Sequence, residues 1–212
     1  MRTIVLAVVA LVALGIGSYF LIFRKPPATP AAWLSTKAVE QKVHSANPFD
    51  QSEGIASLEL QKGQDSVRQL EGLLNSASPE EIMEAVRALG RLEAKHPIDK
   101  LEKLYKASMT REDGHGLSIR TAIIDALGSI QDERTVDFLG RELSAHESLM
   151  HKEHLLDALE KIGSKRALPY LEKYLKSLSE HPAENFPELQ FLMEQAQLKT
   201  KQIIDDLRKS KS

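Results

Sequence analysis

The sequence contains no cysteine, and only 5% of its 212 residues are aromatic. Without cysteine the chain forms no disulfide bond, has no thiolate nucleophile and offers no thiolate ligand to zinc. A chain with few aromatic residues that is rich in Leu, Ala, Lys and Glu is typical of packed helices rather than of a β-sheet. The composition therefore favours an all-α protein.

The sequence also lacks a strong excess of either charge. Its net charge is -2, from 28 basic and 30 acidic residues. The first 25 residues hold three of the bases (Arg2, Arg24 and Lys25) and no acid, so the remainder has 25 bases against 30 acids, or -5. Because phosphate backbones attract basic surfaces, this mildly acidic body is a poor match for nucleic acid, and we expect no nucleic-acid partner.

Charged residues are absent from Ile4–Phe23, a run of twenty mostly aliphatic residues. A helix of that length spans the hydrocarbon core of a bilayer, about 30 Å. The run is longer than the apolar region of a usual cleaved signal peptide, and no clear cleavage site follows it. Residues 1–25 are thus predicted to be a transmembrane signal anchor, although a cleaved signal or a buried soluble helix stays possible.

The flanking charges of this run are nearly balanced, so they hardly define its orientation. The short segment before the first apolar run is typical of a signal anchor whose N-terminus is cytoplasmic. On that basis we predict a single-pass protein of the bacterial inner membrane, with its C-terminal domain in the periplasm.

Residues 26–63 are predicted to be a proline-containing tether. The prolines of Pro-Pro-Ala-Thr-Pro at 26–30 prevent a continuous helix and favour a stiff, extended chain. Residues 31–43 allow a short helix, after which Asn47-Pro48 and Gly54 are expected to interrupt the chain again. The helical domain is predicted to occupy residues 64–212.

A pattern of apolar residues recurs three times in this domain, at 79–107, 117–145 and 148–178. Taking Leu89, Leu127 and Leu159 as position zero, each copy has Ala just before it and apolar residues three, nine, twelve and sixteen positions later. The pattern predicts the end of one helix, a tight turn and a second helix. Such pairs bury their apolar stripes only by stacking on one another, which predicts a short α-solenoid. A helix from Asp65 and a last helix from 187 to about 209 are expected to cap the stack.

The copies resemble HEAT repeats, in particular the short form typified by A-L-G-x-I-x-D-x-R-A-V-P-x-L. Residues 126–139 read A-L-G-S-I-Q-D-E-R-T-V-D-F-L, and residues 166–171 keep R-A-L-P-Y-L. The resemblance covers about residues 79–178 and is weakest in the first copy. It implies a binding scaffold, since HEAT repeats serve mainly in that role, but it names no partner.

Residues with catalytic or metal-binding chemistry do not form a recognisable motif. G-x-S-x-G, P-loop and G-x-G-x-x-G patterns are all missing. His151 and His154 share a helical face, a spacing that a metal ion can use, but the sequence supplies no obvious third ligand. We interpret them as solvated or helix-capping side chains, and we predict no enzyme activity, no metal and no cofactor.

The second helix of each repeat carries the candidate binding residues. It is expected to line the concave face of the stack. Fourteen residues after position zero, on the side away from the apolar stripe, each copy has a cation, and eleven residues after it two copies have an aromatic residue. The candidate partner-binding residues are Lys100, Lys103, Phe138, Arg141, Tyr170 and Lys173. In the opposing interpretation, the aromatic residues pack between repeats and the cations are incidental surface charge.

These observations predict a membrane-anchored, non-catalytic scaffold or adaptor that binds another protein. An alternative is an accessory lyase or chaperone for a chromophore-bearing protein, because some lyases of that kind contain short HEAT-like repeats. A resemblance to HEAT-like DNA glycosylases is disfavoured by the acidic body.

Overall fold

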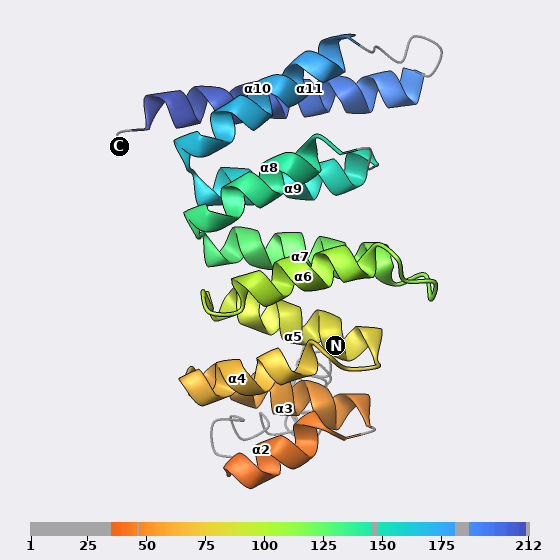
Figure 1. Ribbon diagram of the computed structural model, residues 1–212, viewed down its shortest axis with the longest axis vertical. Helices are drawn as coiled ribbons and strands as arrows, with labels where there is room; N and C mark the ends of the chain where they lie inside the picture. The colour runs from red at the N-terminus through yellow and green to blue at the C-terminus, as the bar shows by residue number, and fades with distance from the viewer. Residues whose placement is uncertain (1–34, 46, 146–147, 181–186, 211–212) are drawn as a thin grey trace, which may run out of the picture.

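The structure is a computed structural model of the 212-residue chain, and it describes residues 35–45, 47–145, 148–180 and 187–210. The described part is helical and contains no strand. Its helices lie across the long axis of the molecule and stack from α2 at one end to α10 and α11 at the other (Figure 1). The α-helices are α2 (Thr36–Val43), α3 (Pro48–Gln61), α4 (Gln64–Leu73), α5 (Pro79–Arg91), α6 (Ile98–Ser108), α7 (Gly116–Ile130), α8 (Val136–Leu143), α9 (Leu149–Ile162), α10 (Leu168–Glu180) and α11 (Pro187–Lys209).

The three predicted repeats are confirmed as the helix pairs α5–α6, α7–α8 and α9–α10. Leu89, Leu127 and Leu159 are each fully buried, and so are the alanines before them to within a few per cent. Helix α5 begins at Pro79, where the first repeat begins, and Ser78 caps it by accepting a hydrogen bond from the Glu81 backbone N–H at 3.2 Å. The repeated apolar positions therefore form one continuous core along the stack.

In the second and third repeats, an arginine ties the turn inside the repeat to the turn of the preceding repeat. Asp132 and Ser164 cap short 3₁₀ turns by accepting from the backbone N–H two residues on. This places Arg134 to donate to the Lys95 carbonyl at 3.2 Å, and Arg166 to donate to the Glu133 carbonyl at 3.4 Å. The arginine of the repeated motif thus satisfies an orphan carbonyl in the neighbouring turn.

Residues 36–61, part of the segment 26–63 that was predicted to be a tether, form the helices α2 and α3, and α3 packs on α4 and α5. Asn47-Pro48, expected to interrupt the chain, instead starts α3: the Asn47 side chain accepts from the Phe49 N–H at 3.0 Å. Gly54 lies inside α3, where a Cβ would come within 2.6 Å of the Val43 backbone nitrogen. Its missing side chain lets α2 pack closely on α3, so the stack begins at least two helices earlier than the sequence indicated.

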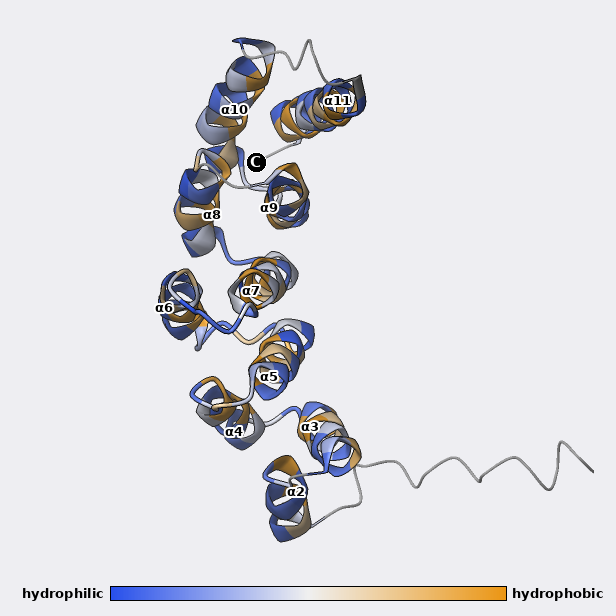
Figure 2. Cartoon of the chain, turned by 90° about the vertical axis from the view of Figure 1, so that its right-hand side faces the viewer, coloured by the Kyte–Doolittle hydropathy of each residue, from blue (hydrophilic) through white to orange (hydrophobic). Residues whose placement is uncertain are grey.

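The stack is curved, and the first helix of each repeat (α5, α7 and α9) lies on the inner side of the bend (Figure 2). Small residues meet between these helices: a Cβ on Gly90 would lie 2.8 Å from Ala126 Cα, and one on Gly128 would lie 2.8 Å from Ala158 Cα. The second helices are instead separated by aromatic rings, with Tyr105 against Phe138 at 5.1 Å between ring centroids. Neighbouring repeats are therefore closer together on the side of the first helices than on the side of the second helices. We call this difference in spacing the wedge.

This wedge reverses one expectation from the sequence. The second helices α6, α8 and α10 were expected to line the concave face, but they lie on the convex side (Figure 2). The concave face is formed by α5, α7, α9 and their neighbours α3 and α11. The physical reason is the difference in side-chain volume between the two rows.

The predicted localisation in the inner membrane is contradicted. Within residues 35–210, gaps excepted, no helix is both long and apolar enough to cross a bilayer. Helix α11 is long enough at 23 residues, but it carries Lys199, Lys201, Asp205 and Asp206, whose burial in hydrocarbon is costly. The single-pass assignment is therefore not supported, and the run Ile4–Phe23 that motivated it lies outside the described residues.

Candidate protein-interaction surfaces

Three of the predicted binding residues form a row of cations on the convex side. Lys103 lies midway between Leu101 and Tyr105, which are both fully buried and four residues apart, so its side chain points away from the core. Arg141 has the same relation to two buried leucines, and Lys173 to one buried and one half-buried leucine. All three are exposed, and none forms a salt bridge or side-chain hydrogen bond with another described residue. We call Lys103, Arg141 and Lys173 the cation row.

The two predicted aromatic residues serve packing between repeats instead. Phe138 is only 2% exposed and meets the Tyr105 ring edge to face, at an interplanar angle of 89°. The Tyr170 ring covers Gly140, and its hydroxyl donates to Asp137 at 3.2 Å. The opposing interpretation of these residues therefore fits the structure, and Phe138 is not available to a partner.

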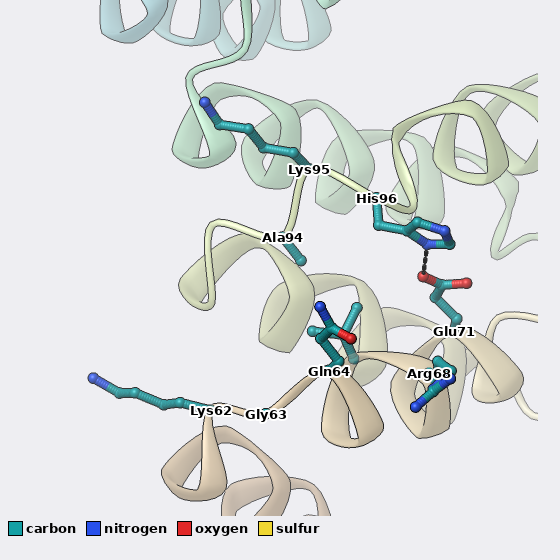
Figure 3. Close-up of a pocket in the computed structure, with 9 residues that line it drawn as sticks. Lys62, Gly63, Gln64, Arg68, Glu71, Ala94, Lys95 and His96 are labelled. Atoms are coloured by element: carbon teal, nitrogen blue, oxygen red, sulfur yellow. Dashed lines mark hydrogen bonds and ion pairs between the residues drawn. The ribbon is translucent and has the colours of Figure 1, made fainter.

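Lys100, the sixth predicted residue, is engaged within the chain. Its ammonium group bonds the carboxylate of Glu71, whose side chain is only 4% exposed, and His96 Nδ1 lies 2.6 Å from the other carboxylate oxygen. Burial by itself raises the pKa of Glu71, but the hydrogen bonds from Lys100 and His96 outweigh it and hold the pKa below its ordinary value. Figure 3 shows this carboxylate and His96 at one side of a hollow between the α3–α4 and α5–α6 turns. The cluster ties α4 to the following repeat.

The two histidines differ from their predicted solvated state to different degrees. His151 is 2% exposed, with Nε2 3.0 Å from the Tyr105 hydroxyl and Nδ1 3.4 Å from the Thr121 hydroxyl. His154 is half-buried, and its Nδ1 lies 2.8 Å from an Asp125 oxygen. No group of three or more His, Asp or Glu side chains in the described chain is placed to hold a metal ion.

The concave face contains an apolar groove that the sequence analysis missed. Leu117 and Met150, each the second residue of its helix, are 47% and 75% exposed, and Leu192 of α11 is 50% exposed. Met150 lines two adjoining hollows, one shared with Leu117 on α7 and one shared with Leu192 on α11. We call Leu117, Met150 and Leu192 the concave groove. The only sequence signal is an apolar residue outside the repeated core positions, which is too common to interpret alone.

Polar groups surround the concave groove unevenly. Arg87 of α5 lines the hollow on the Leu117 side, is exposed, and has no salt bridge to a described residue. At the other side Lys199 bonds Asp157 and lies 3.9 Å from Glu153, so its charge is compensated. The His154–Asp125 pair lines the same hollow as Arg87. Among the described residues that line the two hollows, Arg87 is therefore the cation without a salt bridge.

A buried hydroxyl lies beside the second hollow. Tyr174 of α10 lines this hollow, is 2% exposed, and its hydroxyl has no hydrogen-bond partner among the described residues. Burial raises the pKa of Tyr174 to about 12. A buried hydroxyl without a partner costs about 1–3 kcal/mol.

Comparison with known proteins supports the repeat architecture. Residues 117–181, from α7 to the end of α10, match the family described as HEAT repeats. A crystal structure of an engineered protein, Northeast Structural Genomics Consortium target OR329, is similar over 78% of both chains, at 19% identity and a TM-score of 0.42. That TM-score is too low to establish a common fold. No curated protein matches the chain.

Proposed function

We propose that the protein is a non-catalytic scaffold that binds a partner protein through the cation row. HEAT repeats commonly mediate contacts between proteins, and residues 117–181 match that family. The observation that carries the proposal is the presence of one exposed, unpaired cation on each of three successive second helices. Lysine and arginine side chains held in a row on rigid helices favour an acidic surface on the partner.

Three acids close in sequence to this row differ in how they are engaged. Glu102 is half-buried, and burial holds its pKa above the ordinary value although Lys106 and Arg141 act in the opposite direction. Asp137 is occupied by Arg166 at 2.5 Å. Glu172, next to Lys173, is paired with Arg208 of α11 at 2.7 Å. Two of the acids beside the row, Asp137 and Glu172, are thus paired within the chain rather than with the row.

The experiment compares the full chain with a variant in which Lys103, Arg141 and Lys173 are all changed to Glu. A photo-reactive residue at Ser144, one turn from Arg141, would form adducts with the partner in cells, and mass spectrometry would identify them. We expect the variant to lose these adducts while its circular dichroism stays unchanged, because all three side chains are exposed. Changing Lys37, Lys62 and Lys209 to Glu is the control with the same charge difference. Adducts that persist in the first variant would show the row to be ordinary surface charge.

A further inference from the structure

We propose that the concave groove is a second binding surface, which takes an amphipathic helix with apolar side chains at seven-residue spacing and an acidic end. This surface is on the opposite side of the stack from the cation row, so the inference does not depend on the proposed function. If both hold, the protein is an adaptor that holds two partners on its two faces.

The distance between the apolar side chains of the groove determines the spacing of apolar residues expected in the bound helix. Leu117, Met150 and Leu192 lie on three successive first helices, α7, α9 and α11. Packed helices lie about 8–10 Å apart, and an α-helix rises about 10 Å in seven residues. A helix that crosses α7, α9 and α11 therefore meets one apolar side chain of the groove with every second turn.

The backbone of the groove favours a helix over an extended peptide. A peptide that binds as a strand obtains its affinity from main-chain hydrogen bonds to a free sheet edge. The described part of the chain contains no strand, so the groove offers no such edge. A helical occupant satisfies its own backbone and needs only apolar contacts with Leu117, Met150 and Leu192.

The charges beside the groove determine which end of the bound helix is expected to be acidic. Arg87 is exposed and unpaired at the α5 side, whereas Lys199 at the α11 side is neutralised by Asp157 and Glu153. An acidic residue at the end of the occupant near Arg87 gains an ion pair, and a basic residue there meets a like charge.

The experiment uses the full chain and a displayed library of helical peptides of about 20 residues, long enough to cross three helices. The library varies the spacing of leucines and the charge at each end. We expect enrichment of leucines at seven-residue spacing with Glu or Asp at one end. Enrichment of another spacing, of extended proline-rich or β-branched peptides, or of nothing would overturn the proposal.

Variants then test where the enriched peptide binds. Met150→Glu is expected to weaken its affinity at least tenfold, because it places a charge at the centre of the groove. Phe49→Glu is the matched control, since Phe49 is 85% exposed on α3, outside the groove. Arg87→Glu is expected to reverse the preference from an acidic to a basic end. Equal affinity for the wild type and Met150→Glu would place the peptide elsewhere and reject the groove.

Two other occupants are distinguished by the same variant. Concentration-dependent dimerisation of the wild type that Met150→Glu abolishes would assign the groove to a second copy of the chain. Peptide affinity that rises when residues 1–34 are deleted, in the wild type but not in Met150→Glu, would assign it to that segment. Either result would replace the partner helix. The triple change in the cation row is expected to leave peptide binding unaltered, which separates the two proposals.

Discussion

The row of first helices and the row of second helices differ in the size of the side chains at their contacts. Between the first helices, Gly90 meets Ala126 and Gly128 meets Ala158, so backbones approach closely. Between the second helices, the Tyr105 and Phe138 rings and the ring of Tyr170 fill the space. The first row is the tighter one, and the second row is wider, with aromatic rings between its helices. The comparison teaches that residue volume at a few contact positions determines which side of the stack is concave.

The largest effect is expected from removing volume in the tight row. Leu127 is fully buried in the central repeat, so Leu127→Ala opens a cavity and should lower the free energy of unfolding by about 2–5 kcal/mol. Leu60→Ala is the control, because Leu60 is 52% exposed, and it should change stability by about 0.5 kcal/mol or less. Urea unfolding of both variants checks this. Similar losses in the two would mean that the central repeat is not the core of the stack.

Adding volume in the tight row tests the close approach itself. Gly128→Ala places a Cβ 2.8 Å from Ala158 Cα, and the resulting overpacking should cost about 1–3 kcal/mol. Gly72→Ala, in α4, meets nothing within 4 Å and should gain about 0.5–1 kcal/mol from helix propensity. The opposite signs are measured by thermal unfolding. A gain in both would contradict the tight packing of α7 on α9.

Removing volume in the wide row should change shape more than stability. Tyr170→Ala takes away the ring that covers Gly140 and the hydrogen bond to Asp137, so α8 and α10 are free to approach. We expect the stack to straighten, with a larger maximum dimension in small-angle X-ray scattering and a loss of about 1–2 kcal/mol. Lys173→Ala, an exposed position on the same helix, is the control for scattering. Unchanged scattering would show that the wedge does not set the curvature.

The smallest effect is a difference in pH dependence. Because the folded-state pKa of Glu71 lies below its ordinary value of 4.5, its contribution to stability is present above that value and is lost as pH falls through the folded-state pKa. The wild type should therefore lose more stability than Glu71→Gln between pH 5 and the acid limit of folding. Chemical unfolding at several pH values measures the difference. Parallel curves for the two proteins would mean that Lys100 and His96 do not stabilise the Glu71 carboxylate.

The repeat was predictable because its signal is local and recurs. Leu127 and its counterparts, the turn caps and the proline at the start of α5 all depend on residues close in sequence. Asn47-Pro48 has the same arrangement as Ser78-Pro79, a capping residue before a proline in the first helical position, and this arrangement would have located α3. Gly54 gave no such help, because a glycine that breaks a helix and one that admits a neighbouring helix look alike in sequence.

The candidate sites were only partly predictable, because the burial and pairing of a side chain depend on residues that are distant in sequence. The cation row follows from helical periodicity. The burial of Phe138 depends on Tyr105, which lies 33 residues earlier, and that of His151 on a contact across 46 residues. Lys100 forms a salt bridge with Glu71, which lies 29 residues earlier. The direction of curvature was missed for the same reason, since it arises from contacts between repeats.

The turn arginines also relate the fold to the order in which the chain is made. Arg134 binds the carbonyl of Lys95, and Arg166 binds that of Glu133, so each arginine reaches back to a turn synthesised earlier. The acceptor therefore leaves the ribosome before its donor, and each new repeat meets a partner that already exists. Growth from the N-terminus then adds one docked helix pair at a time, and the most recently made pair is always the least protected.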